Sequence, residues 1–264
     1  MTPREPSARA LITGATGGIG AAFARALPEE TAMILTGRDE EALTLLAAEF
    51  GPRAETVVAD LATHEGLDAV ARAAEAGEVD LLINNAGLGQ YGNFLDVPFE
   101  EHQTTLRVNV EAVMALIHRL VPGMIDRAEL SGRNAGLINV ASSAAFFPIP
   151  TLATYAASKA LVLSFTESFA AEMSGKPIDV LVSCPGAVKT AFGARAGYSG
   201  GRIPGAMAPE KVAAQSLAAL GRQSTVVIGP ASAAAFAPVA LARSLFGHAF
   251  VRASRVMDRI GERT

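Results

Sequence analysis

Tyr155 and Lys159 lie four residues apart in a segment that predicts a helix over residues 154–174. On a helix this spacing places both side chains on one face. The pKa of a free phenol is ~10, so bringing it to ~7 requires about 4 kcal/mol of stabilisation of the phenolate. A lysine ammonium one turn away can contribute to that stabilisation where water is excluded. The pair indicates a proton donor and acceptor for a reacting oxygen, although the spacing alone also fits an ordinary exposed pair.

Ser142 follows an apolar segment, residues 135–141, that predicts a buried strand. The carboxyl ends of parallel strands form the binding crevice of an open α/β sheet. A hydroxyl at that point can donate a hydrogen bond to a substrate carbonyl while Tyr155 gives or takes the proton. The neighbouring Ser143 is the alternative for this role, and a structural turn serine is its ordinary reading.

Asn109 is an amide inside an otherwise apolar segment, residues 99–126, that predicts a long helix. Such an amide can bend the helix and hold a water molecule that contacts Lys159. A buried amide with a purely structural role is an equally good interpretation, because buried polar side chains need hydrogen-bond partners.

A glycine-rich turn joins the first apolar strand to the first predicted helix, in Thr13-Gly14-Ala15-Thr16-Gly17-Gly18-Ile19-Gly20. Glycines allow the backbone to approach a pyrophosphate, and the start of the helix offers free N–H groups to it. The spacing fits T-G-x-x-x-G-x-G and T-G-x-x-G-x-x-G equally well. The turn therefore predicts dinucleotide binding without choosing between two subgroups of binding proteins.

Arg38 directly follows the second predicted strand, where a binder of NAD commonly has an acidic residue. Its guanidinium can bind a 2′-phosphate through two parallel N–H groups, so we expect NADP rather than NAD. The alternative is a solvated loop arginine beside Asp39, which would cap the next helix. Asp60, at the end of the third strand, is expected to bond the adenine or to cap a helix. A bound nicotinamide cation would add to the effect of Lys159 on Tyr155.

Short apolar runs alternate with segments of helical period along the chain, as in βαβ units. Strands are expected over residues 8–13, 32–36, 54–59, 79–84, 135–141, 178–183 and 225–228. Helices are expected over residues 19–27, 39–50, 64–76, 99–126 and 154–174. The strands are nearly all apolar, which indicates a parallel sheet covered on both faces. We expect one α/β domain over residues 1–264, with a glycine-rich flap at about 191–208 and a helical tail at about 232–264.

Composition excludes several other classes of protein. The chain has 264 residues, half of them hydrophobic, with a mean hydropathy of +0.31, which excludes intrinsic disorder. A net charge of −4 argues against general nucleic-acid binding. One cysteine, Cys184, and four scattered histidines predict neither a disulfide framework nor a metal site. The amino terminus lacks a secretory pattern, and two prolines interrupt the uncharged stretch of residues 223–242, so we expect a cytoplasmic protein without a transmembrane span.

Together these motifs resemble the short-chain dehydrogenase/reductase family over roughly residues 8–230. The matching pieces are Thr13 to Gly20, Asn84 to Gly87, Asn109, Ser142, Tyr155, Lys159 and Pro185 to Thr190. The resemblance implies a Rossmann-like, doubly wound parallel sheet of about seven strands. It also implies that Tyr155 is the catalytic acid/base, Lys159 its activator and Ser142 the group that polarises the carbonyl. Asn109 would complete a proton relay. Chain length and Asn84 to Gly87 match the shorter reductase type rather than the longer sugar-nucleotide epimerase type.

The resemblance also extends the expected cofactor site, where Thr190 would reach the nicotinamide carboxamide and Lys159 the ribose. Similar proteins with an arginine like Arg38 take NADP, although Thr16 stands where the family often has a basic residue. The residues that we expect at the cofactor are Thr13, Gly14, Thr16, Gly18, Ile19, Gly20, Arg38, Asp60, Leu61, Asn85, Ala86, Gly87, Tyr155, Lys159, Pro185, Gly186, Val188 and Thr190. Dimers or tetramers are usual for similar proteins, so we expect a homo-oligomer.

Three apolar segments are expected to line the substrate pocket, namely residues 88–94, 144–148 and the flap. Their composition favours a hydrophobic carbonyl compound or secondary alcohol, although Phe146 and Phe147 also fit an ordinary core. The basic amphipathic tail can lie on an anionic membrane surface, cover the pocket, contact a second subunit or pack on its own domain. Packing on its own domain is the simplest interpretation. The tail loosely resembles that of bacterial reductases that act on long-chain lipids or ketones.

Two functions follow from these patterns. The first is an NADP(H)-dependent oxidoreductase that interconverts a hydrophobic carbonyl compound and a secondary alcohol. The second is a non-catalytic NAD(P)-binding protein that senses the redox state. The complete set of Asn109, Ser142, Tyr155 and Lys159 favours the enzyme, because a sensor has no use for a proton relay.

Overall fold

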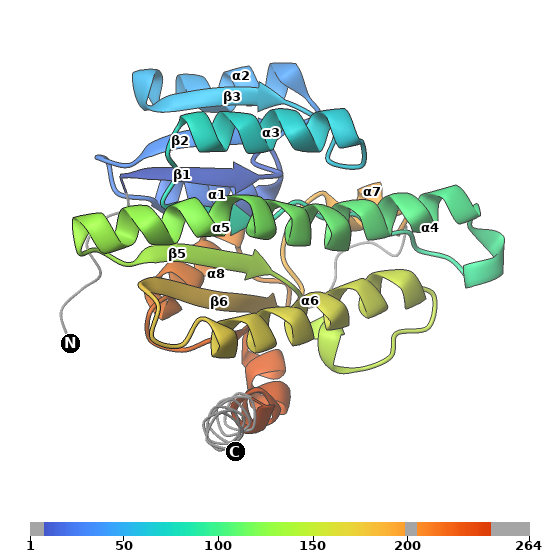
Figure 1. Ribbon diagram of the computed structural model, residues 1–264. Coiled ribbons are helices and arrows are strands. Elements are labelled where there is room, and N and C mark those ends of the chain that lie inside the picture. Colours follow the sequence, from blue (N-terminus) through green and yellow to red (C-terminus); the bar gives the residue numbers. More distant parts are fainter. Residues whose placement is uncertain (1–7, 199–204, 244–264) are drawn as a thin grey trace, which may run out of the picture.

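The computed structural model describes residues 8–198 and 205–243 and shows a seven-stranded parallel sheet (Figure 1). The strand order is β3-β2-β1-β4-β5-β6-β7. The strands are β1 (Arg9–Thr13), β2 (Ala32–Gly37), β3 (Ala54–Val58), β4 (Leu81–Asn84), β5 (Ala135–Val140), β6 (Ile178–Pro185) and β7 (Thr225–Ile228). The expected Rossmann-like α/β fold is confirmed, and each predicted strand exists with ends that differ by at most two residues.

The chain order of the strands reverses between β1 and β4, which are neighbours in the sheet. In a doubly wound sheet this switch point opens a crevice at the carboxyl ends of the strands. The residues that leave β1 and β4 at that end are the glycine turn and the segment Asn84 to Gly87. The topology therefore brings two sequence-distant motifs to one place.

Helices cover both faces of the sheet. The helices are α1 (Gly18–Ala26), α2 (Glu40–Ala48), α3 (His64–Ala76), α4 (Phe99–Leu106), α5 (Ala112–Ser131), α6 (Ala153–Glu172), α7 (Phe192–Arg195) and α8 (Pro209–Ala219). Leu11, Leu82 and Leu137 stand in register on three adjacent strands and pack in the core shared with α3 and α5. The next row, Ile12, Ile83 and Ile138, faces the core on the other side with α1 and α8. This alternation explains why the strands are apolar throughout.

The long helix expected over residues 99–126 is interrupted, which corrects the sequence-based expectation. Arg107–Glu111 forms a π-helical turn, η3, between α4 and α5. Asn109 lies in this turn, so the regular α-helical hydrogen bonding is interrupted around the residue expected to bend the helix. The helical stretch Phe99–Ser131 is also long and apolar enough to span a membrane, but 56% of its apolar window is buried in the protein. Within the described residues, this stretch alone passes that test of length and composition.

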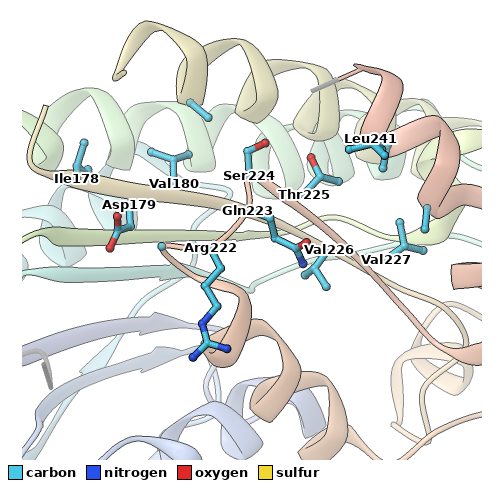
Figure 2. A pocket seen from close by; sticks show the side chains of 14 residues that line it. Ile178, Asp179, Val180, Arg222, Gln223, Ser224, Thr225, Val226, Val227 and Leu241 are labelled. Carbon is cyan, nitrogen blue, oxygen red and sulfur yellow. The ribbon is translucent and has the colours of Figure 1, made fainter. Parts of the chain in front are cut away.

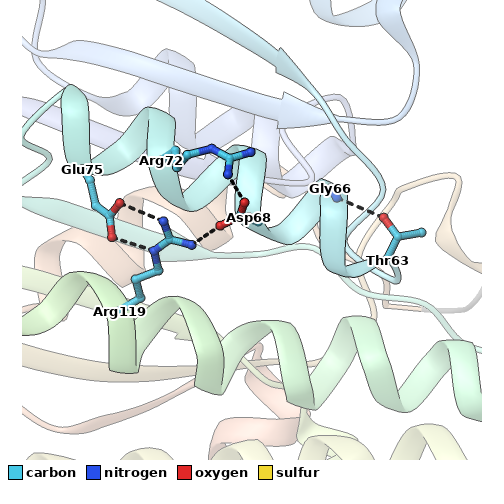
Figure 3. A network of polar contacts seen from close by, with 6 residues as sticks. All are labelled: Thr63, Gly66, Asp68, Arg72, Glu75 and Arg119. Atoms are coloured by element: carbon cyan, nitrogen blue, oxygen red, sulfur yellow. Dashed lines mark hydrogen bonds and ion pairs between the residues drawn. The ribbon is translucent and has the colours of Figure 1, made fainter.

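Charged side chains join α3 to α5 at the surface (Figure 3). Arg119 on α5 donates two hydrogen bonds to Glu75, at 2.6 and 2.9 Å, and another to Asp68. Asp68 also pairs with Arg72 one turn along α3. These hydrogen bonds lower the pKa values of Glu75 and Asp68. Because the groups are exposed, the network orients the two helices while the apolar core beneath supplies most of the stability.

Candidate active site

The two predicted reacting hydroxyl groups meet at the carboxyl end of β5. Ser142 follows β5 and begins the short 3-10 helix η4 (Ser143–Phe146), where its side chain accepts a hydrogen bond of 3.1 Å from the Ala144 N–H. Tyr155 lies in the first turn of α6, and Ser142 and Tyr155 share a side-chain hydrogen bond. The structure therefore joins Ser142, rather than Ser143, to the tyrosine.

Lys159 lies one turn after Tyr155 and is buried, with 4% of its surface exposed. Its Nζ atom donates a hydrogen bond of 2.9 Å to the Val140 carbonyl and lies 5.9 Å from the centre of the Tyr155 ring. Burial lowers the pKa of this ammonium group to about 8. The expected one-face arrangement is present, and the nitrogen is positioned by a backbone carbonyl of β5.

In the chain without a nicotinamide cofactor, the pKa of Tyr155 is raised, so the lowering expected from Lys159 together with the nicotinamide cation stays a prediction. Burial raises the pKa of the phenol above its usual value, and the hydrogen bond with Ser142 opposes that rise. The physical reason is that exclusion of water disfavours the phenolate, while the ammonium is bonded to Val140 instead of the phenol. A further positive charge at the site, such as a nicotinamide cation, would favour the phenolate.

Asn109 positions the loop that follows β4. Its Nδ2 donates to the Leu88 carbonyl at 2.9 Å, and its Oδ1 accepts from the Leu88 N–H at 2.8 Å. Nδ2 also donates to Ser158 Oγ at 2.9 Å, on the same helix as Lys159. A Cβ atom on Gly87 would stand 3.3 Å from Lys159 Nζ and 3.5 Å from Asn109 Oδ1. The amide therefore has a structural role, and Asn109 Oδ1 and Lys159 Nζ both border Gly87.

Thr13 and Asn85 hold the glycine turn against the end of β4. Thr13 Oγ1 accepts hydrogen bonds of 3.0 Å from the N–H groups of Asn85 and Ala86. Asn85 Nδ2 donates back to the carbonyls of Thr13 and Gly14, at 2.9 and 3.1 Å. Gly14 has φ +63°, and a Cβ there would lie 2.8 Å from the Ala86 Cα. The side chains of Thr13 and Asn85 therefore position the turn, and the small residues allow its close approach.

The glycines of the turn differ in how strictly they are required. At Gly20 a Cβ atom would overlap the Gly14 carbonyl oxygen, and at Gly18 it would stand 2.7 Å from the Thr190 methyl group. At Gly17 the nearest atom would be 3.2 Å away. The structure therefore favours the T-G-x-x-x-G-x-G reading, through Gly14, Gly18 and Gly20.

Arg38 and Asp60 face each other across the ends of β2 and β3, with 3.9 Å between Arg38 Nη1 and Asp60 Oδ2. Arg38 is exposed. Asp60 also accepts a hydrogen bond of 2.9 Å from the Ala62 N–H, and Asp39 caps α2 through the Ala42 N–H. Leu61 packs in the core beside α3 and α5, so it is placed behind the crevice rather than in it.

Two further predicted residues lie beside this edge. Thr16 is half-buried, and its Oγ1 would lie 3.4 Å from a Cβ on Gly37, at the end of β2. Ile19 packs on the core beneath α1. Thr16 therefore lies near the end of β2, next to Arg38. The side chain of Ile19 instead packs against the core.

The segment Pro185 to Thr190 crosses the end of the sheet and fixes both ends of the flap. Val188 pairs with Met207 in an isolated bridge, and Lys189 N–H donates to the Met207 carbonyl at 2.8 Å. A Cβ on Gly186 would stand 2.5 Å from Ser232 Oγ, so glycine allows the helix of residues 230–243 to begin against this segment. Residues 199–204 of the flap and 244–264 of the tail lie outside the described residues.

Comparison with known proteins agrees with this geometry. A family model for short chain dehydrogenase matches residues 8–198. The chain belongs to the short-chain dehydrogenase/reductase family. It is 37% identical to the nodulation protein G of Rhizobium meliloti (strain 1021) over 187 residues, which cover 70% of this chain and 74% of the relative. It is therefore an oxidoreductase that acts on CH–OH groups with NAD(P).

Two solved structures are similar to this dehydrogenase/reductase. A short-chain dehydrogenase from Sphingobium yanoikuyae in complex with NADPH has a TM-score of 0.77 and 29% identity, with 92% of this chain and 95% of that chain covered. A 3-ketoacyl-(acyl-carrier-protein) reductase from Brucella melitensis complexed with NADH has a TM-score of 0.72 and 29% identity, covering 83% and 96%. The two similar structures thus hold different nicotinamide cofactors.

The crevice of this dehydrogenase/reductase fits a dinucleotide. Helix α1 begins at Gly18 without a side-chain cap and without an acidic residue in its first turn, so its N–H groups and positive dipole face the crevice uncompensated. At Gly18 and Gly20 the Thr190 methyl group and the Gly14 carbonyl leave no room for a side chain. Phosphates would be held by α1 and the nicotinamide end would lie toward Lys159 and Thr190.

Helix α7 covers the reacting tyrosine of this dehydrogenase/reductase. The rings of Phe192 and Tyr155 lie 5.2 Å apart, and a Cβ on Gly89 would stand 3.0 Å from Phe192 and 3.2 Å from Tyr155. The Tyr91 N–H donates to the Ala196 carbonyl at 2.7 Å, which joins the flap to the loop after β4. Sequence reasoning placed the flap near the pocket but missed Phe192, because no pattern marks which flap residue meets the tyrosine.

The described part of the tail packs on its own chain. Phe236 stacks against Phe146 and Phe147, with ring centres 5.1 and 5.3 Å apart. Arg243 pairs with Glu167 of α6 at 2.8 Å. The helix of residues 230–243 therefore forms one wall behind the apolar segment that follows Ser142.

A cavity of about 580 Å³ lies between β6, β7 and this helix (Figure 2). It is lined by the first residues of β6, by β7 and by Leu241. Its lining from β6 is confined to Ile178, Asp179 and Val180 at the start of that strand, so it is separate from the active site. None of the predicted site residues lines it.

Proposed function

We propose that this enzyme uses NADP(H) to interconvert a hydrophobic carbonyl compound, a ketone or aldehyde that can be lipid-like, and a secondary alcohol. The observation that carries the proposal is the hydrogen bond between Ser142 and Tyr155, one helical turn from a buried Lys159 whose Nζ lies 5.9 Å from the centre of the Tyr155 ring. Bound nicotinamide exchanges a hydride with the substrate carbon. The protein supplies orientation and the proton.

The side chains have distinct parts in this scheme. Ser142 donates a hydrogen bond to the carbonyl oxygen and so stabilises its developing negative charge. Tyr155 transfers its proton to that oxygen in the reduction and takes it back in the oxidation. Lys159 and the cationic nicotinamide lower the cost of forming the phenolate. The amide of Asn109 holds a water molecule through which the proton is replaced.

The preference for NADP(H) rests on Arg38. Its guanidinium is exposed at the end of β2, and at 3.9 Å from Asp60 it is not held in a close ion pair. An arginine at this point matches a 2′-phosphate in both charge and geometry. Asp60 already accepts a hydrogen bond from the Ala62 N–H of its own turn, so its carboxylate is less able to accept one from a free ribose hydroxyl.

The preference for a hydrophobic substrate rests on the aromatic side chains around the reacting groups. Phe192 covers Tyr155, and Phe146 and Phe147 follow Ser142. These side chains offer apolar contact with few competing hydrogen-bond groups. A polar sugar would leave its hydroxyl groups without partners at such a surface.

The test is a panel of ketones, aldehydes and sugars, assayed with NADPH and with NADH by the absorbance of the reduced nicotinamide. We expect apolar carbonyl compounds to be reduced with NADPH and at a higher kcat/KM than with NADH. Tyr155→Phe should lose at least ~100-fold in kcat while it keeps cofactor affinity. Preference for NADH, preference for a polar sugar, or full turnover in Tyr155→Phe would each contradict one part of the proposal.

A further inference from the structure

Arg195 lies over the glycine turn, although it is far from it in sequence. It is the last residue of α7, the one-turn helix of the flap. Its Nη2 atom stands 3.9 Å from the position that a Cβ on Gly17 would occupy. Gly17 is the N-cap of α1, so the guanidinium lies above the point where that helix begins.

The same side of the flap touches the turn at a second point. The Thr190 methyl group lies 2.7 Å from a Cβ position on Gly18. Thr190 Oγ1 accepts a hydrogen bond of 3.3 Å from the Phe192 N–H, which fixes the start of α7. The position of Arg195 is therefore set by the contact of the flap base with the glycine turn.

Two sources of positive charge lie close together here, the start of α1 and the guanidinium of Arg195. Helix α1 has no side-chain cap and no acidic residue in its first turn. Arg195 is exposed and has no ion pair or side-chain hydrogen bond within residues 8–198 and 205–243. A guanidinium above the positive end of a helix is unfavourable unless a negative group lies between them.

We infer that Arg195 binds the pyrophosphate of the dinucleotide from the flap side, opposite the first turn of α1. This inference rests on the proposed function, since it requires a bound dinucleotide. Arg38 and Arg195 then have separate tasks, because Arg38 follows β2 and Arg195 faces α1.

The inference has a structural consequence for the reacting groups. Phe192 and Arg195 are three residues apart on α7, so one turn of helix carries both side chains. Phe192 contacts Tyr155. Binding of the pyrophosphate by Arg195 therefore helps hold the aromatic cover on the tyrosine.

The experiment measures the affinity for NADPH and for NADH by calorimetry in the full chain without substrate. We expect Arg195→Ala to weaken both cofactors by the same factor, about ten-fold, because both carry the pyrophosphate. Arg195→Lys should recover part of the loss. Arg38→Ala should weaken NADPH alone. Arg133→Ala, which removes an exposed charge after α5, serves as the control and should bind both cofactors like the wild type.

The outcomes separate this inference from the proposed function. Unchanged affinity for both cofactors in Arg195→Ala would overturn the inference, and so would a loss confined to NADPH, which would place Arg195 at the 2′-phosphate. An equal loss in Arg195→Ala together with no effect of Arg38→Ala would support the inference and contradict the preference for NADP. Failure of the wild type to bind either cofactor would overturn both.

Discussion

A buried ammonium group beside a half-buried phenol is costly for the folded protein, and the contacts of Lys159 show how the site accommodates it. The nitrogen is bonded to the Val140 carbonyl, and burial lowers its pKa to about 8. Near neutral pH the group is therefore still mostly charged, and it is held where a phenolate would form. Exclusion of water also raises the Tyr155 pKa. Lys159 therefore places a positive charge beside the phenol, but the phenol stays protonated in the chain without cofactor.

Lys159→Met is expected to change how stability depends on pH. Because the pKa of Lys159 falls from 10.5 to about 8 on folding, the unfolded chain holds the proton more firmly between these values. The burial cost is therefore fully present below pH 8 and decreases as pH rises toward 10.5. The stability of Lys159→Met relative to wild type should fall by about 2 kcal/mol between pH ~7 and ~9.5.

Denaturant unfolding of the protein without cofactor at both pH values measures this difference. Lys211→Met on α8 is the matched control, since Lys211 is exposed and its difference from wild type should stay constant. If the stability difference between Lys159→Met and wild type did not change with pH, burial would not disfavour the charged form of Lys159. Turnover of Lys159→Met should be lost at either pH.

Residue types and spacing predicted that Ser142 and Lys159 lie beside Tyr155. Helix periodicity places Lys159 on the same face as Tyr155, and the end of β5 places Ser142 at the crevice. Spacing did not predict the direction of the tyrosine pKa, which depends on how water is excluded by Phe192 and Gly89. Arg195 was missed for a similar reason. A single arginine in a glycine-rich segment gives no periodic signal, and its contact with Gly17 exists only after the chain has folded.

At the scale of elements, the glycine turn shows how a sequence ambiguity is resolved by packing. Two spacings fitted the turn, and they differ in whether Gly17 or Gly18 is required. A Cβ added at Gly20 would overlap the rigid backbone of Gly14, and one added at Gly18 would overlap the side chain of Thr190. A Cβ added at Gly17 would have no neighbour closer than 3.2 Å. The cost of adding a methyl group should follow that order.

Gly20→Ala is accordingly expected to lose the most stability, about 3 kcal/mol, because the backbone around Gly14 must shift. Gly18→Ala should lose less, about 2 kcal/mol, because the Thr190 side chain can move aside once it gives up its hydrogen bond from the Phe192 N–H. Gly17→Ala should be close to wild type, at most about 1 kcal/mol less stable. Urea unfolding of the three variants gives the order, and a cost at Gly17 equal to that at Gly20 would favour the other spacing.

The strands and most helices could be predicted because the hydropathy pattern of each is uniform along its length, and each packs in a single kind of surroundings. The division of the helix expected over residues 99–126 could not be predicted as a π-helical turn. That turn exists where Asn109 satisfies both backbone groups of Leu88 and contacts Ser158, in segments distant along the chain. Hydropathy patterns give no information about such contacts between residues that are distant along the chain.

At the scale of the whole molecule, the chain after β7 returns to the active site. The helix of residues 230–243 begins against Gly186 through Ser232, and its Arg243 pairs with Glu167. Between these ends, Phe236 stacks on the two phenylalanines that follow Ser142. Of the possibilities for the tail, packing on its own domain is therefore present in the described part, and this packing forms a wall of the region where an apolar substrate would lie.

Phe236→Ala should therefore change which carbonyl compounds the enzyme prefers. Removing the ring leaves space behind Phe146 and Phe147, so bulky apolar substrates should show a several-fold lower KM relative to small ketones. Affinity for NADPH should not change, because the ring contacts neither the glycine turn nor Arg38. Val239→Ala, at a half-exposed position on the same helix, is the control for a general loosening of the tail. Steady-state kinetics with a homologous series of ketones measures the effect, and an equal change in KM for small and large substrates, or a loss of NADPH affinity, would show that the tail acts on stability rather than on the pocket.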